Sequence, residues 1–271
     1  MDNRAIGVFD SGLGGLTAVR VLRRMLPDEN IIYFGDTGRM PYGGRPVDQI
    51  RLIARQNIDF VESFGIKAIL AACGTISSNA GELLAENAIH AVGVLCPGAA
   101  ELAALGKKRL GVIATATSIK SGAFEREILR LCPEAEVTAL ACPKFVPMIE
   151  RGVFSPDNAE VRAVVAEALA PLKAAGVEAL LLGCTHYGII SEAIQAYLGE
   201  GVTLVGASDA AARELARYLR KNALLAEGGG SERYYTSGDT AAFRQLAPVM
   251  LGGQMRGEPE YVEPFPLKGQ L

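Results

Sequence analysis

The chain has 271 residues, and its 27 Lys and Arg against 30 Asp and Glu give a formal net charge of −3. This balance excludes a strongly basic protein that binds nucleic acid by neutralising phosphates. Because 49% of the residues are hydrophobic, the chain is not an acidic disordered segment. We expect a globular protein of one large or two smaller domains.

The sequence has neither the pattern of an export signal at its start nor that of a membrane span. The start MDNRAIGVFDSG has a short apolar run, whereas an export signal needs a positive start and a longer apolar core. No segment approaches the roughly 18 apolar residues of a membrane span. The five cysteines form no CxxC pair, as is usual for a chain whose thiols stay reduced. We therefore expect a cytoplasmic protein that does not enter a membrane and binds no nucleic acid.

Short apolar runs alternate with helical patterns along the chain. In chain order the predicted strands are Ala5–Phe9, Asn30–Gly35, Ala68–Ala72, Ala91–Leu95, Arg109–Ala114, Glu136–Ala141, Ala179–Leu182 and Thr203–Val205. The predicted helices are Leu16–Met25, Gln49–Ser63, Ser77–Glu86, Gly122–Leu131, Asn158–Ala175 and Asp209–Asn222. This alternation predicts an α/β fold of βαβ units, with mostly parallel strands that are covered on both faces.

The chain also contains a faint internal repeat. Ala5–Ser11 (AIGVFDS) opens one series and Arg109–Thr115 (RLGVIAT) opens a second, and each later reaches a strand that ends in a cysteine, Cys73 or Cys184. Two similar units that face each other would place both cysteines at one cleft. The alternative is that any two strand-to-helix turns share such small residues.

The repeat suggests where the chain divides. The first series ends near residue 97, and the chain returns near residue 206. We therefore predict one discontinuous domain of residues 1–97 and 207–271, and a second of residues 98–206. Residues 227–231 (EGGGS) are predicted to form a loop, and the segment from Gly252 on to form extended surface chain.

Four polar clusters follow predicted strands, at the carboxyl ends where open α/β sheets bind ligands. They are Asp10-Ser11-Gly12, Asp36–Gly44, Cys73-Gly74-Thr75 and Cys184–Tyr187. The glycines of the first cluster can hold an anion on backbone N–H groups at a helix N-terminus. A dinucleotide turn is disfavoured because Thr17 stands where the third glycine of G-x-G-x-x-G belongs, and no Walker lysine is present.

Cys73 and Cys184 are the candidate chemical groups. A thiol at a strand end, just before a helix, is expected to have a lowered pKa and to be partly thiolate at pH 7. Two such thiols in one cleft can act as acid and base on opposite faces of a substrate. The alternative for any one cysteine is a buried, inert side chain. We assign that inert role to the other three, Cys96, Cys132 and Cys142.

His186 lies two residues after Cys184. It can activate the thiol, contact a substrate or simply fill a turn. The two residues would begin a zinc site only with a third and fourth ligand, which the sequence does not offer, so we predict no metal. A pyridoxal-phosphate enzyme is disfavoured as well, because no lysine stands at a strand end among the polar clusters.

Taken in order, these segments resemble the glutamate racemases, which belong to the cofactor-independent aspartate/glutamate racemase superfamily. The resemblance covers nearly the whole chain and rests on Ile6–Gly15, Asp36–Gly43, Ala72–Thr75, Gly111–Ile113 with Ser121-Gly122, and Leu182–Tyr187. It implies two Rossmann-like parallel-sheet domains related by pseudo-two-fold symmetry, with the active site in the cleft between them.

The resemblance also implies residue roles. Cys73 and Cys184 would be the two catalytic acid/bases that invert the α-carbon of glutamate, without metal or cofactor. Asp10, Glu150 and His186 would assist the thiols. The implied substrate-binding residues are Asp10, Ser11, Pro41, Tyr42, Gly43, Gly74, Thr75, Thr117, Thr185 and His186. The protein would be a cytoplasmic homodimer that supplies D-glutamate for peptidoglycan synthesis.

Two positions depart from the family pattern. The family usually has Asn where this chain has Gly74, and Pro where it has Gly188. Loss of the Asn amide predicts weak binding of glutamate that Gly74→Asn improves, unless the glycine makes room for a different substrate or has a positive φ that Asn would tolerate only with strain. The departure keeps open two alternatives, a racemase for aspartate or another amino acid, and a catalytically weak binding or regulatory protein on the same scaffold.

Overall fold

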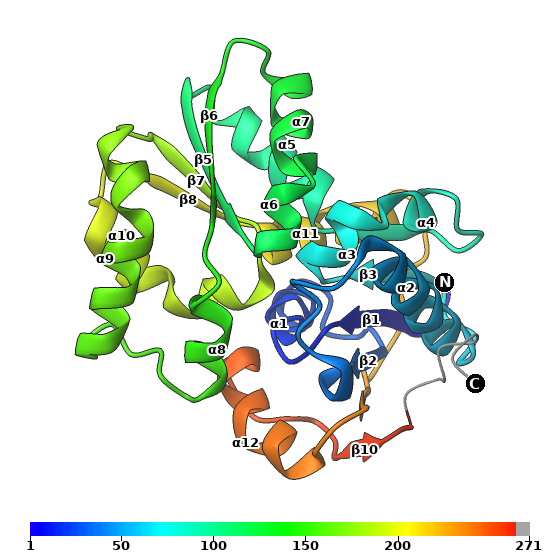
Figure 1. Cartoon of the computed structure of the whole chain (residues 1–271). Coiled ribbons are helices and arrows are strands. Elements are labelled where there is room, and N and C mark those ends of the chain that lie inside the picture. Colours follow the sequence, from blue (N-terminus) through cyan, green and yellow to red (C-terminus); the bar gives the residue numbers. More distant parts are fainter. Residues whose placement is uncertain (264–271) are drawn as a thin grey trace.

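Two parallel sheets organise the chain (Figure 1). The computed structural model describes residues 1–263. The six-stranded sheet runs in the order β10 (Pro259–Tyr261), β9 (Glu232–Thr236), β2 (Ile31–Gly35), β1 (Ile6–Asp10), β3 (Ala68–Ala71), β4 (Ala91–Gly93). The four-stranded sheet runs in the order β6 (Glu136–Ala141), β5 (Arg109–Ala114), β7 (Ala179–Leu182), β8 (Thr203–Gly206). Every neighbouring pair in both sheets is parallel, so the predicted fold class is confirmed.

The internal repeat is present in the topology. The order β2-β1-β3-β4 in one sheet corresponds, strand for strand, to β6-β5-β7-β8 in the other. Cys73 follows the end of β3 and Cys184 follows the end of β7, so the two cysteines occupy equivalent places. The eight strands expected from the sequence all exist, and the sheets separate as the repeat implied. The proposed domain boundaries at residues 97 and 206 remain a prediction.

Helices connect these parallel strands. They are α1 (Leu16–Met25), α2 (Val47–Glu62), α3 (Gly74–Asn79), α4 (Gly81–Ala85), α5 (Leu95–Ala104), α6 (Ala116–Lys120), α7 (Ala123–Leu131), α8 (Phe145–Glu150), α9 (Ala159–Ala174), α10 (Ser191–Leu198), α11 (Ala207–Lys221) and α12 (Thr240–Leu251), with the 3-10 turns η1 (Thr37–Arg39) and η2 (Thr185–Ile190). Helix α1 has the bounds predicted from the sequence. Its apolar face is buried, and the basic residues in its last turn interact favourably with the helix dipole. No described helix is long and apolar enough to cross a membrane.

Several elements differ from the sequence prediction. The helix expected over residues 77–86 is two helices, because Ala80 has a non-helical backbone and joins α3 to α4. Strand β9 and helix α12 were not predicted. The segment from Gly252 on is not only extended surface chain, since β10 pairs with β9; its last part, residues 264–271, lies outside the described residues. Residues 227–231 form a loop, as expected.

One apolar core joins the two sheets. A single buried cluster runs from Val8 and Leu70 of the first sheet to Val112 and Leu181 of the second. Helix α11 lies between the sheets and contacts α1, α5, β4 and β8 (Figure 1). This shared core packs the two sheets against each other. It therefore controls the geometry of whatever site their carboxyl ends form.

Candidate active site

A cavity of about 340 Å³ lies at the carboxyl ends of both sheets. Parallel strands place these ends at one edge of each sheet, so loops far apart in the sequence meet around the cavity. The residues predicted for the site that line it are Asp10, Ser11, Pro41, Tyr42, Gly43, Cys73, Gly74, Thr75, Glu150, Cys184, Thr185 and His186. The structure thus brings together all the predicted residues except Thr117.

Thr117 has a different role. It does not line the cavity, and its hydroxyl oxygen instead accepts a hydrogen bond of 2.6 Å from the Gly44 backbone N–H. The bond attaches the loop that carries Pro41–Gly43 to helix α6 of the other sheet. Thr117 therefore supports a lining segment without facing the cavity.

The sequence analysis missed some of the residues that line the cavity. Thr115 follows β5 in the same place as Ser11 follows β1, so the repeat itself contained the signal. Cys142 follows the end of β6 and also faces the cavity, although it was assigned an inert role. Burial raises the pKa of its thiol to about 12, so Cys142 is a neutral side chain at pH 7.

Cys73 is a buried thiol at the start of α3. Only 3% of the residue is exposed. Burial raises the pKa of the Cys73 thiol, and the negative charge of Asp10 raises it further, while the Ile76 N–H in the first turn of α3 offsets only part of this. The lowered pKa expected from the helix N-terminus is therefore wrong for Cys73. At pH 7 this group is a thiol, which can donate a proton but is not already a base.

Cys184 belongs to a chain of three polar groups. Its sulfur lies 3.9 Å from Nδ1 of His186, and Nε2 of His186 lies 3.1 Å from Oε1 of Glu150. Burial by itself lowers the pKa of His186, but the hydrogen bonds to Cys184 and Glu150 outweigh it and raise that pKa to about 10. At pH 7 the ring is therefore an imidazolium that can donate to both neighbours.

Asp10 lines the cavity and carries one carboxylate oxygen without a hydrogen-bond partner among the described residues. The side chain is buried, and its Oδ2 accepts hydrogen bonds from the backbone N–H groups of Gly12 (3.3 Å) and Gly15 (2.9 Å). Its Oδ1 is buried without a hydrogen-bond partner in the described part of the chain. Burial raises the pKa of Asp10, while the charge of His186 and the backbone donors lower it in part. A buried polar atom without a partner is costly, so a donor supplied by a ligand would stabilise it.

The family follows from comparison with known proteins. The sequence profile of the Asp/Glu/hydantoin racemases matches residues 16–235. The chain belongs to this racemase family. The resemblance found in the sequence is thereby confirmed.

Several curated relatives and solved structures are similar over nearly the full chain. The glutamate racemase of Streptococcus suis (strain 05ZYH33) is 39% identical over 257 residues, which are 93% of this chain and 96% of the relative. The structure of glutamate racemase isoform RacE1 from Bacillus anthracis has a TM-score of 0.91 at 33% identity, covering 97% of this chain and 98% of that one. The glutamate racemase of Francisella tularensis in complex with D-glutamate has a TM-score of 0.89 at 37% identity, covering 99% of each chain.

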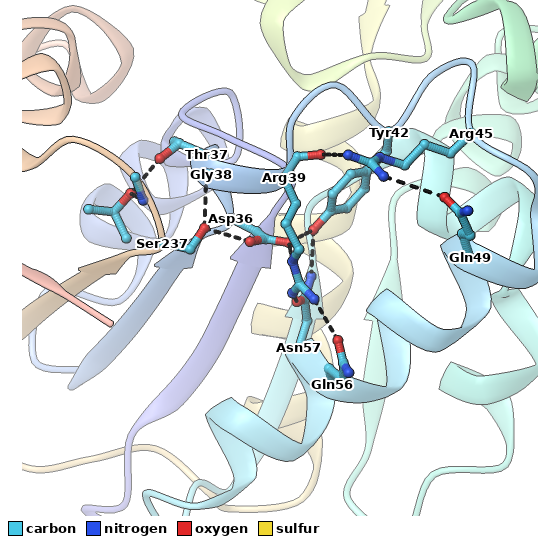
Figure 2. Close-up of polar contacts among 12 residues, drawn as sticks. Asp36, Thr37, Gly38, Arg39, Tyr42, Arg45, Gln49, Gln56, Asn57 and Ser237 are labelled. Carbon is cyan, nitrogen blue, oxygen red and sulfur yellow. Dashed lines mark hydrogen bonds and ion pairs between the residues drawn. The ribbon is translucent and has the colours of Figure 1, made fainter. Parts of the chain in front are cut away.

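A buried polar network fixes the loop between β2 and α2 in this racemase-family chain (Figure 2). The carboxylate of Asp36 accepts hydrogen bonds from the Ser237 hydroxyl at 2.6 Å and from Nε of Arg39 at 2.7 Å. The Tyr42 hydroxyl donates to the same carboxylate and accepts from Nδ2 of Asn57 at 3.1 Å. Asp36 does not line the cavity. Its role is to hold Tyr42, and with it the backbone of the lining loop.

Gly74 is closed in by the opposite sheet. A Cβ atom built on Gly74 would lie 2.2 Å from the carbonyl oxygen of Gly183, and the φ of Gly74 is not positive. The space into which an Asn side chain would extend is thus occupied by backbone. The positive φ that was the alternative explanation for this glycine is therefore wrong, and a side chain at residue 74 would require that backbone to move. The expectation that Gly74→Asn improves binding stays a prediction. Gly188, the second departure, has no atom within 4 Å of such a Cβ.

The described residues offer no metal centre. Among residues 1–263, no group of three or more His, Cys, Asp or Glu side chains is arranged to hold a metal ion. The five cysteines are all free, and Cys73 and Cys184 both face the same cavity. What the arrangement can do chemically is acid–base work by two thiols, each with polar groups beside it.

Proposed function

We propose that this chain is a cofactor-independent glutamate racemase in which Cys73 and Cys184 are the two acid/bases. The observation that carries the proposal is the placement of the thiols. They follow equivalent strands, β3 and β7, of two sheets with the same strand order, and both face one cavity. Inversion without a cofactor needs a proton removed from one face of the α-carbon and another delivered to the opposite face.

The two thiols have different polar neighbours. Cys184 has the His186 imidazolium at its sulfur, whereas burial raises the pKa of Cys73, which is suited to begin as the thiol. In one direction Cys184 takes the α-proton, its S–H bond forms as the C–H bond breaks, and Cys73 then gives its proton to the other face. The reverse direction exchanges the two roles. The negative charge of Asp10 assists Cys73 by keeping the proton on that sulfur until it is delivered, and Glu150 holds His186.

The substrate must also be held while charge develops on it. We propose that the unpaired Oδ1 of Asp10 accepts from the ammonium group of the amino acid. Hydroxyl and backbone N–H groups at Ser11, Thr75 and Thr185 line the cavity and are suited to receive the carboxylates. Preorganised donors of this kind stabilise the negative charge that forms when the α-proton leaves. The remaining binding residues that we propose are Pro41, Tyr42, Gly43, Gly74 and His186.

The wider setting is part of the proposal. The likeness to glutamate racemases supports a cytoplasmic homodimer whose product, D-glutamate, enters peptidoglycan synthesis. The relative from Francisella tularensis was solved with D-glutamate, which supports this amino acid as the ligand here too.

An amino-acid panel in deuterium oxide tests the proposal. Purified protein is incubated with L- and D-glutamate, L- and D-aspartate and other amino acids, and each is analysed for α-deuterium and chirality. We expect glutamate to be inverted in both directions with deuterium entering at the α-carbon. Inversion of aspartate alone would identify a different racemase. Binding of glutamate without exchange or inversion would identify a binding protein and refute the enzyme.

A further inference from the structure

Four hydroxyl groups and one side-chain amide form a continuous series of hydrogen bonds between α3 and α6, which we call the hydroxyl chain. The Thr75 and Thr115 hydroxyls lie 3.1 Å apart, and the Thr115 and Ser118 hydroxyls lie 2.9 Å apart. The Ser78 hydroxyl donates to Ser118 at 3.0 Å, and Nδ2 of Asn79 donates to Ser78 at 2.9 Å. Because α3 follows β3 and α6 follows β5, the hydroxyl chain connects the two sheets.

The hydroxyl chain begins at a group that only donates and ends at the cavity. The amide nitrogen of Asn79 does not accept hydrogen bonds, so the Ser78 oxygen is the acceptor in the first bond. At the other end, Thr75 and Thr115 line the cavity, whereas Ser78 and Ser118 do not. Within residues 1–263 the Thr75 hydroxyl has no hydrogen-bond partner other than Thr115. The last hydroxyl of the chain is therefore available to a group inside the cavity.

The number of protons gives the hydroxyl chain one direction. A hydroxyl has a single proton, so it donates in one bond at a time. Since Ser78 donates to Ser118, the Ser118 proton is left for Thr115. The Thr115 proton is in turn left for Thr75, whose own proton then has no acceptor within residues 1–263. An anion suits such a proton best, because hydrogen bonds to charged acceptors are stronger than those to neutral ones.

Backbone carbonyls compete for the Ser78 proton. The Gly74 oxygen lies 2.8 Å from the Ser78 hydroxyl and the Thr75 oxygen lies 3.3 Å from it, and serines within helices often bond back to such carbonyls. While the proton is on one of them, Ser118 and Thr115 are free to donate in either direction. Thr75 can then donate to Thr115 and not into the cavity. An anion in the cavity favours the other arrangement, because hydrogen bonds in series polarise and strengthen one another.

We propose that Ser78 is a positioning residue that acts through Ser118 and Thr115 to turn the Thr75 hydroxyl proton toward a carboxylate of the substrate. This inference rests on the proposed binding of an amino acid in the cavity. Among residues 1–263 no Lys or Arg lines the cavity, so His186 is the one cationic side chain there and the other donors to a carboxylate are neutral. A neutral donor that already faces the ligand loses less free energy to reorientation when the ligand binds.

The test is a double-mutant cycle of Ser78→Ala and Thr75→Val, measured as kcat/KM for L- and D-glutamate. We expect Ser78→Ala to lower kcat/KM by about threefold to tenfold, as for the loss of one neutral hydrogen bond, and Ser118→Ala to do the same. Ser78→Thr keeps a hydroxyl and is expected to restore most of the activity. In Thr75→Val, the further change Ser78→Ala is expected to have no effect, because the hydroxyl through which it acts is absent. Ser63→Ala is the matched control, since the Ser63 hydroxyl donates to the Phe60 carbonyl at 2.7 Å at the end of α2 and does not line the cavity.

The outcomes separate this inference from a structural role and from the proposed function. If the bond between Ser78 and Ser118 only bridges the two sheets, it persists in Thr75→Val, and Ser78→Ala then lowers kcat/KM by the same factor in both backgrounds. That result refutes the positioning role, and so does a Ser78→Ala protein with wild-type activity.

A wild type that binds glutamate without inverting it refutes the proposed function alone. The cycle is then measured on the dissociation constant for D-glutamate, by titration followed with nuclear magnetic resonance, and the same measurement is used if Thr75→Val turns over too slowly to assay. If Thr75→Val yields no folded protein, Thr75→Ala takes its place. A wild type that does not bind glutamate refutes both the proposed function and the positioning role.

Discussion

The substitution Glu150→Gln tests directly whether His186 is charged in the site. Oε1 of Glu150 lies 3.1 Å from Nε2 of His186, and the Glu150 side chain is only 20% exposed. Glu150→Gln keeps an oxygen that can accept from the ring and removes the negative charge. Both acceptors still bind the imidazolium, so the substitution removes the attraction between two unit charges, which is about 1–4 kcal/mol at a separation of about 4 Å in surroundings between bulk water and a protein surface.

Loss of this attraction lowers the pKa of His186 by about one or more, since one pKa unit corresponds to about 1.4 kcal/mol. We therefore expect His186 to titrate at about 10 in the wild type and about one pH unit lower in Glu150→Gln. The alkaline loss of racemisation is expected to move down by the same amount, because the imidazolium beside Cys184 is lost earlier.

The assay is a titration of the imidazole carbon–hydrogen signals by nuclear magnetic resonance. The chain has two histidines, and His90 serves as an internal control because burial lowers its pKa below the usual 6.5. Glu167→Gln is the matched variant, since Glu167 forms an exposed ion pair with Lys144 and does not touch either histidine. A wild-type His186 that titrates near His90, or a Glu150→Gln protein with an unchanged His186, would show that the reasoning is wrong.

Three further predictions concern the thiols, the lining loop and stability. Cys73→Ala and Cys184→Ala are each expected to abolish racemisation in both directions, while exposed Cys96→Ser keeps the wild-type rate; a racemising Cys184→Ala contradicts the two-base mechanism. Tyr42→Phe removes the hydroxyl that donates to the buried carboxylate of Asp36 (Figure 2). We expect the free energy of unfolding, measured by denaturant titration, to fall by about 1–3 kcal/mol, and the KM, measured by steady-state kinetics, to rise. Because the pKa of His186 is higher in the folded chain than in the unfolded one, protonation stabilises the fold; this contribution is complete below pH 6.5 and is lost as the pH rises through about 10. Thermal unfolding of the wild type and of His186→Gln between pH 6 and 10.5 measures it, and curves with parallel pH dependence would contradict it.

The local pattern of the sequence determined the strands, the parallel class of the sheets and the position of both cysteines at strand ends. Buried parallel strands appear as continuous apolar runs, and the polar residue after each run lies at the carboxyl end of its strand. Strand β9 (ERYYT) escaped this reasoning because Glu232 and Arg233 interrupt the apolar pattern. Glu232 is buried there because Arg23 of α1 pairs with it at 2.5 Å, a partner that lies far away in the sequence.

The chemistry of the site depended on contacts that the tertiary structure alone decides. A helix N-terminus after Cys73 is visible in the sequence, but the burial and the Asp10 charge that raise its pKa come from packing. Likewise, the sequence shows the glycine at position 74. It does not show that the carbonyl of Gly183, 109 positions later, fills the space beside that glycine. Desolvation and steric exclusion depend on every atom nearby, whichever part of the chain supplies it. The periodicity of the sequence does not predict which distant residues become those neighbours.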